Sequence, residues 1–87
     1  MQQNGFDVST AVREILAAEL GIPVESIGLD DEIANLPGVD SVRVIRTIAR
    51  LEKKFGVTVP DEDLFSARIV KDLVAVVARI TEPAKTV

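Results

Sequence analysis

Apolar residues recur at helical spacing in three separate stretches of the chain. Residues 9–20 carry an apolar side chain every three or four positions and end before Gly21. Residues 41–55 have a sharper pattern, with an apolar face and a basic face, and residues 70–80 form the third stretch. A period of about 3.6 residues predicts three amphipathic helices around one core. The predicted core positions are Val12, Ile15, Leu16, Leu20, Val44, Ile48, Leu51, Phe55, Val70, Leu73, Val74, Val77 and Ile80, with Ile45 at the edge of the apolar face of the second helix.

The segments between these stretches predict a shorter helix and a long packed connection. Residues 61–65 follow a proline and begin with acidic side chains, which favour a first helical turn. Residues 21–40 contain several prolines and glycines, yet also apolar residues, among them Ile22, Val24, Ile27, Leu29, Ile33 and Leu36, so we expect this connection to lie across the core. A short helical turn is expected near residues 25–27 or 31–34.

No stretch alternates apolar and polar residues with the period of a strand. The pattern therefore predicts an all-α four-helix bundle with three longer helices and one short helix. We expect one folded domain over residues 9–80, a flexible lead-in over residues 1–8 and a tail over residues 81–87.

Composition limits the chemistry available to the chain. It has 87 residues, 47% of them hydrophobic, and it contains neither cysteine nor histidine. Disulfides and thiolate metal sites are excluded, and the commonest general base and metal ligand is missing. The N-terminus does not resemble a signal peptide, and no apolar run reaches the roughly 18 residues of a membrane span. We expect a cytoplasmic monomer.

Charge is segregated along the sequence although the net charge is only −4. Residues 25–40 hold five acidic residues and no basic one, whereas residues 41–55 hold five basic residues and one acidic one. The basic face could attract nucleic acid, but no aromatic side chains accompany it to stack on bases. A membrane role is disfavoured because the apolar side of the same helix is needed for the core. The acidic triplet at residues 61–63 lacks the glycine and glutamate of a calcium loop. We expect the basic face to contact a protein partner.

Ser41 is the candidate functional residue. It follows Asp40, opens the best-marked helix and is preceded by Pro37 and Gly38. A hydroxyl at this position can cap the helix, and it can also carry a covalent phosphate at the positive helix end. A hydrolytic triad is disfavoured because no histidine is present to activate the serine.

Further motifs lie at fixed distances from one another around Ser41: Asp40-Ser41-Val42, Leu51-Glu52, Phe55, Val59-Pro60-Asp61 and Asp72-Leu73. Together they resemble the acyl carrier protein family and its peptidyl carrier relatives over roughly residues 9–80. The resemblance implies that Ser41 is esterified with 4′-phosphopantetheine from coenzyme A, whose thiol holds intermediates as thioesters. It also implies a carrier that is not an enzyme. The implied partners are a phosphopantetheinyl transferase and acyl- or aminoacyl-loading and processing enzymes.

One feature departs from the carriers of fatty-acid synthesis. Their second helix is typically acidic on its exposed face, whereas this chain has Arg43, Arg46 and Arg50. We therefore expect dedicated partners in a specialised polyketide, nonribosomal or lipid-modifying pathway, with Asp40, Val42 and the three arginines at the docking surface. The alternative is an unmodified helical adaptor that binds a protein or acidic partner through the same basic face.

Overall fold

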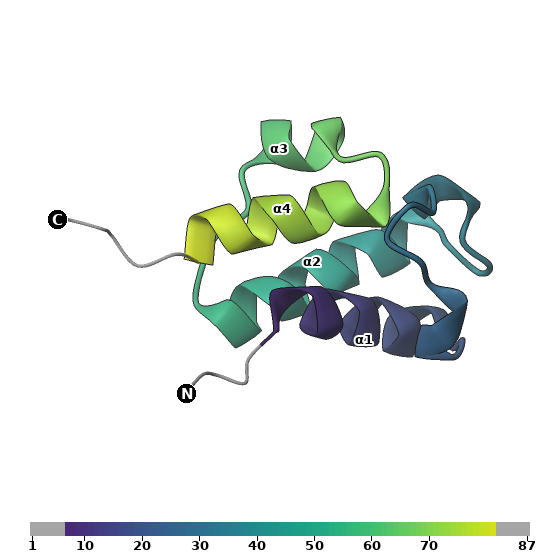
Figure 1. Ribbon diagram of the computed structural model, residues 1–87. Helices are drawn as coiled ribbons and strands as arrows, with labels where there is room; N and C mark the ends of the chain where they lie inside the picture. Colours follow the sequence, from purple (N-terminus) through teal and green to yellow (C-terminus); the bar gives the residue numbers. More distant parts are fainter. Residues whose placement is uncertain (1–6, 82–87) are drawn as a thin grey trace, which may run out of the picture.

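The computed structural model describes residues 7–81 and confirms the all-α fold. Its elements are α1 (Val8–Leu20), two 3-10 helices η1 (Val24–Ser26) and η2 (Ile33–Asn35), α2 (Ser41–Phe55), α3 (Asp61–Ser66) and α4 (Val70–Thr81). The three longer helices pack side by side, and the short α3 lies over α4 (Figure 1). Within residues 7–81 there is no strand, only one isolated backbone bridge.

Helix ends agree closely with the predicted limits. α1 begins one residue early because Asp7 accepts a hydrogen bond from the Ser9 N–H at 3.1 Å. It ends at Gly21, whose φ of 70° is in the left-handed region that favours glycine. At the other end of the chain α4 reaches Thr81. The remaining predicted lead-in and tail, residues 1–6 and 82–87, lie outside the described residues.

The core contains the predicted apolar faces with one exception. Val12, Leu51 and Val77 are fully buried, at the centre of the packing between α1, α2 and α4. Ile45, which we expected at the edge of the core, is 62% exposed, so that prediction is wrong. The adjacent inward position is taken by Thr47, which is buried and donates its hydroxyl to the Arg43 carbonyl at 2.8 Å.

The connection over residues 21–40 lies across the core as expected, and it contains both helical turns that were predicted as alternatives. Ile27 and Leu36 are buried in it, whereas Leu29 is 38% exposed. Backbone hydrogen bonds tie it to the start of α4: the Ile33 N–H donates to the Arg68 carbonyl, and the Val70 N–H donates to the Asp31 carbonyl, both at 2.9 Å. The connection is therefore part of the packed structure.

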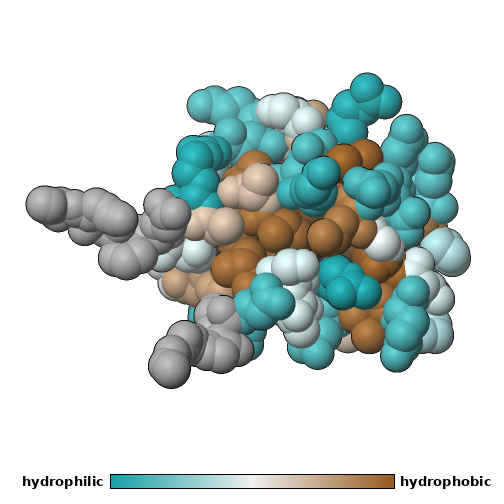
Figure 2. Space-filling model, viewed as in Figure 1, coloured by the Kyte–Doolittle hydropathy of each residue, from teal (hydrophilic) through white to brown (hydrophobic). Residues whose placement is uncertain are grey.

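The fold places the tip of α2 away from the start of α1 and the end of α4. The start of α1 and the end of α4 lie at one end of the bundle, and α2 begins at the opposite end, where the long connection gathers (Figure 1). Apolar side chains show along the middle of the face in Figure 2, framed by hydrophilic ones. None of the helices in residues 7–81 is long and apolar enough to cross a membrane.

Candidate functional site at the tip of the second helix

Asp40, and not Ser41, caps α2. The Asp40 carboxylate accepts a hydrogen bond from the Arg43 N–H at 2.8 Å, and its own backbone is extended. Ser41 is the first helical residue and is exposed, and its hydroxyl has no hydrogen-bond partner among residues 7–81. From the sequence, the Ser41 hydroxyl was itself a possible cap. Because Asp40 has this structural role, the Ser41 hydroxyl is available for chemistry.

The backbone before Ser41 turns tightly against α1. Gly38 has φ of 78°, and a Cβ atom added there would lie 3.3 Å from the Leu20 carbonyl oxygen. The Val39 N–H donates to the Leu36 carbonyl at 3.2 Å and closes the turn. The segment of Pro37 and Gly38 that precedes Ser41 is thus fixed against the end of α1, and it sets the direction of the helix tip.

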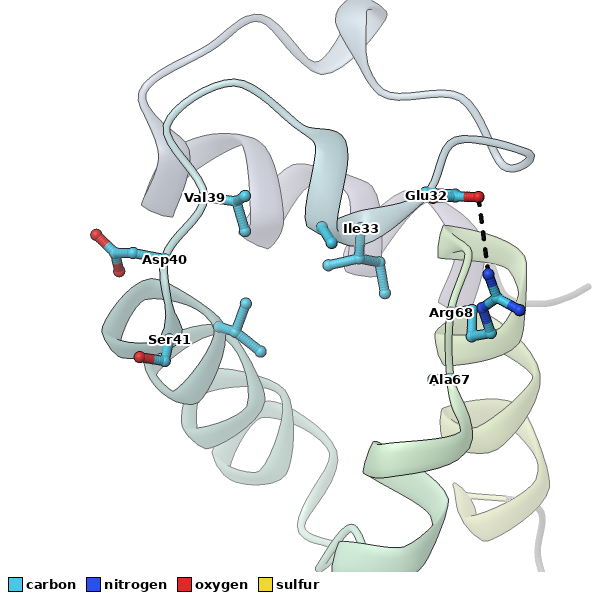
Figure 3. Close-up of a pocket in the computed structure, with 9 residues that line it drawn as sticks. Glu32, Ile33, Val39, Asp40, Ser41, Ala67 and Arg68 are labelled. Atoms are coloured by element: carbon cyan, nitrogen blue, oxygen red, sulfur yellow. Dashed lines mark ion pairs between the residues drawn. The ribbon is translucent and has the colours of Figure 1, made fainter.

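One side of the tip borders a cavity of about 460 Å³, here called the apolar hollow. The residues around it are Glu32, Ile33, Ala34, Val39, Asp40, Ser41, Val44, Ala67 and Arg68. Figure 3 shows Ile33 and Val39 directed into the space and the segment of Ala67 and Arg68 opposite them, while the Ser41 hydroxyl is directed away from it. Most of these residues come from the connection over residues 21–40 and from the short connection between α3 and α4, so helical periodicity could not have grouped them.

The far rim of the apolar hollow is held by polar contacts. Glu32 and Arg68 form an exposed ion pair at 3.9 Å (Figure 3). The Asp72 carboxylate accepts hydrogen bonds from the Arg68 N–H at 2.9 Å and from the Ile69 N–H at 3.2 Å. These two backbone donors hold the pKa of Asp72 below its usual value. The ionised carboxylate thereby fixes the backbone that carries Ala67 and Arg68.

The other side of the tip borders a second cavity of about 540 Å³, here called the arginine hollow. The residues around it are Ala18, Glu19, Asp40, Val42, Arg43, Arg46 and Arg50. The Glu19 carboxylate forms an ion pair with Arg46 Nε at 3.0 Å, and it accepts a hydrogen bond from Arg50 Nη1 at 3.1 Å. Arg43 Nη1 donates to the Glu19 carbonyl at 2.6 Å, and its Nε lies 3.5 Å from Asp40.

The structure therefore gathers all the predicted site residues around the helix tip. Ser41 lies beside the apolar hollow, and Asp40, Val42 and the three arginines surround the arginine hollow. Sequence reasoning missed Glu19, which turns the arginines toward α1. An acidic residue in the last turn of α1 gave no sign of this role, because the contact spans 31 positions of the chain in the case of Arg50.

The tip of α2 suits a covalently bound phosphodiester. The N–H groups of Ser41 and Val42 have no acceptor among residues 7–81, and unpaired N–H groups at a helix start attract anions. The exposed hydroxyl is open to an enzyme that would modify it. The residues present thus fit the phosphate of a phosphopantetheine group, whose thiol could then hold a cargo that the side chains of this protein cannot hold covalently.

Comparison with known proteins agrees with this geometry. The family described as "Phosphopantetheine attachment site" matches residues 10–77. The chain is similar to an acyl carrier protein of Kineococcus radiotolerans, with 30% identity over 84% of this chain and 90% of that protein. It is also similar to acyl carrier proteins of Rickettsia bellii, with 34% identity over 78% of this chain and 79% of that protein, and of Campylobacter hominis, with 26% identity over 88% and 98%.

These matches carry general consequences for the molecule. It is a carrier and not a catalyst, and its cofactor is a covalently attached 4′-phosphopantetheine. Its partners are, in general terms, a phosphopantetheinyl transferase and acyl-processing enzymes. The family model matches residues 10–77, the similar proteins are acyl carrier proteins, and the fold is helical. The chain therefore belongs to the acyl carrier protein family.

Proposed function

We propose that Ser41 carries the 4′-phosphopantetheine arm and that the arm presents acyl intermediates as thioesters. One observation carries this proposal: the Ser41 hydroxyl is exposed at the start of α2 while Asp40 takes over the capping role. In the modification, the Ser41 oxygen forms a bond to the phosphorus that bears the pantetheine half of coenzyme A. The pyrophosphate bond breaks, the nucleotide half leaves, and the hydroxyl proton passes to the transferase or to water.

The apolar hollow supports an acyl cargo. Val39, Val44 and Ile33 give it an aliphatic wall directly beside Ser41. Burying aliphatic carbon against such a wall is favourable by about 25 cal/mol for each Å² removed from water. An arm that leaves Ser41 and turns back could place part of an aliphatic acyl group there, whereas a strongly polar group would gain little.

Charge on α2 supports service in a specialised polyketide, nonribosomal or lipid-modifying pathway. Arg43, Arg46 and Arg50 give the exposed side of the helix a basic character. A partner built for an acidic helix would be repelled there, because like charges at an interface disfavour association. We assign the partner-docking role to these arginines together with Asp40 and Val42.

The test is intact-mass spectrometry of the chain after incubation with coenzyme A, magnesium and a promiscuous phosphopantetheinyl transferase. We expect a gain of one phosphopantetheine, and no gain in Ser41→Ala. Ser26→Ala, which removes another exposed hydroxyl, is the matched control and should be modified like the native chain. Modification of Ser41→Ala would overturn the assignment to this serine. No gain with several transferases would favour the unmodified adaptor that binds through its basic face.

A further inference from the structure

A pair of opposite charges stands at the edge of the apolar hollow, whose wall is otherwise made largely of valine and isoleucine side chains. The pair is Glu32 and Arg68. Figure 3 shows both residues on the side of the hollow that lies opposite Ser41. A cargo that starts from an arm on Ser41 and follows the aliphatic wall would therefore end at a cation and an anion.

The backbone of this pair is held in place from two sides. The Arg68 carbonyl accepts a hydrogen bond from the Ile33 N–H at 2.9 Å, and the Arg68 N–H donates to the Asp72 carboxylate at 2.9 Å. Glu32 forms an antiparallel backbone bridge with Ile69. The two residues are thus fixed at the rim by backbone contacts that do not use their own side chains.

The side chains of the pair do not satisfy one another. Arg68 Nη2 lies 3.9 Å from Glu32 Oε2, whereas a direct hydrogen bond spans about 2.7–3.2 Å. By contrast, the pair of Arg79 and Asp63 closes to 2.9 Å. Asn35 donates to the other Glu32 oxygen, Oε1, at 3.1 Å, and the Arg68 guanidinium has no hydrogen-bond acceptor among residues 7–81. A donor and an acceptor therefore face each other across a gap.

A single hydroxyl group fits this gap. An oxygen about 2.8 Å from both atoms completes a triangle over the separation of 3.9 Å. Water commonly bridges polar groups at this separation, and a hydroxyl offers the same kinds of donor and acceptor as a bridging water. The hydroxyl oxygen would accept from Arg68, and its proton would be donated to Glu32.

The pair as a whole is neutral, which argues against a charged cargo. A carboxylate drawn to Arg68 would also meet Glu32, and an ammonium group drawn to Glu32 would also meet Arg68. The two side chains are 78% and 50% exposed, so water competes for either charged group. A hydroxyl uses both partners and meets no like charge.

We infer that Glu32 and Arg68 recognise a hydroxyl on the distal part of the acyl cargo. The hollow then favours a hydroxylated aliphatic acyl group over a plain one, because its wall takes the hydrocarbon and its rim takes the oxygen. The inference rests on the proposed function, since the cargo reaches the hollow only from an arm at Ser41. It adds a substrate class and two specificity-determining residues to that function.

Protection of the thioester tests the inference with defined probes. A promiscuous phosphopantetheinyl transferase loads Ser41 with hexanoyl, octanoyl or decanoyl groups from their coenzyme A thioesters, each with and without a hydroxyl on the last carbon. Hydroxylamine then cleaves the thioester, and its rate is divided by that of the same thioester on free pantetheine. At the length that reaches the rim, the hydroxylated cargo should be protected about threefold better than the plain one.

Arg68→Met removes the donor and keeps an unbranched side chain, so it should abolish this preference. The variant should fold, because Arg68 supplies only backbone groups to the hydrogen bonds at the rim, and circular dichroism checks this. Lys71→Met is the matched control, since it also breaks an ion pair of 3.9 Å to the long connection, with Asp30. Neither Lys71 nor Asp30 borders the apolar hollow, so the control should keep the preference of the native chain.

A carboxylate-tipped probe tests the neutral character of the rim. Suberoyl, which matches octanoyl in length, should be protected no better than octanoyl in the native chain, because Glu32 faces its carboxylate. Glu32→Gln should raise the protection of suberoyl about twofold and should not raise that of the hydroxylated octanoyl group. Stronger protection of suberoyl than of the hydroxylated group in the native chain would assign the rim to an anionic cargo and overturn the inference.

Two kinds of failure are distinguishable. If no probe can be loaded onto Ser41, the proposed function fails and the inference fails with it. If loading succeeds but the hydroxyl gives no added protection at any length, the recognition of a hydroxyl is overturned while the carrier function stands. The same holds if Arg68→Met behaves like Lys71→Met.

Discussion

The two hollows at the tip of α2 share Asp40 and are similar in size, yet one is lined mainly by apolar side chains and the other mainly by charged ones. The apolar hollow faces the long connection and the start of α4, and its wall includes Val39 and Val44. The arginine hollow faces α1, and its wall is made of charged side chains and Val42. Val42 and Val44 differ only by which side of the helix they occupy. One helix tip can therefore present an aliphatic surface to a cargo and a charged surface to a partner.

The largest difference between the two hollows should be seen when a carboxylate is introduced at Val44 or at Val42 and the free energies of unfolding are compared. Val44 is half-buried against the core, so Val44→Asp should lower the free energy of unfolding by about 2–3 kcal/mol. Val42→Asp should change it by less than about 0.5 kcal/mol, because the site is exposed and an acidic residue suits a first helical turn. Urea unfolding followed by circular dichroism measures both. Equal losses would show that the two sides are not distinct.

The turn before Ser41 should give the next largest effect. Gly38→Ala places a side chain at positive φ and against the Leu20 carbonyl, which should cost about 1–2 kcal/mol. Gly56→Ala has a similar φ but meets no atom within 4 Å, so it isolates the conformational part of the cost. If Gly56→Ala cost more in urea unfolding than Gly38→Ala, the close approach to α1 would not matter for how the tip is placed.

The clamp in the arginine hollow should contribute less. Glu19→Gln weakens two ion pairs whose arginine partners are 67% and 48% exposed, so we expect a loss of about 0.5–1 kcal/mol at low salt. The loss should shrink as salt screens the pairs. Glu14→Gln, on the exposed side of the same helix, is the control and should show no such salt dependence. Urea titrations of both variants at two salt concentrations make the comparison.

The smallest effect should come from the polar support of the apolar hollow. Hydrogen bonds from Arg68 and Ile69 lower the pKa of Asp72, so its contribution is complete above the ordinary value of 3.8 and is lost as pH falls through the lowered pKa. Asp72→Asn should melt at a slightly lower temperature at neutral pH. The melting curves of the two proteins should converge in acid. A difference that persists or grows at low pH would contradict this assignment.

Helical periodicity predicted the parts of the fold that depend on neighbouring positions. The faces of α1, α2 and α4 contain the expected buried residues, and Ser41 begins α2 as predicted. Ile45 was misplaced because the apolar arc of α2 is narrower than its composition suggests, and the inward position went to a hydrogen-bonded threonine, Thr47. A polar residue in that position gives no apolar signal.

The hollows themselves could not be predicted, because each joins segments that are distant in sequence. The Ile33 N–H donates to the Arg68 carbonyl, and this backbone hydrogen bond joins two irregular connections, which no periodic pattern encodes. The contact of Glu19 with Arg46 depends on the angle at which α1 crosses α2. The sequence identified the arginines as a free basic face, and only the packing of the two helices showed that they are held.

The arrangement of the bundle has a practical consequence for anchoring the protein. The start of α1 and the end of α4 lie at the end of the bundle opposite Ser41 (Figure 1). A linker, an affinity label or a solid support joined beyond either helix would therefore leave the serine and both neighbouring hollows open to an approaching enzyme. The residue that is modified and the two positions suited to attachment therefore lie at opposite ends of the bundle.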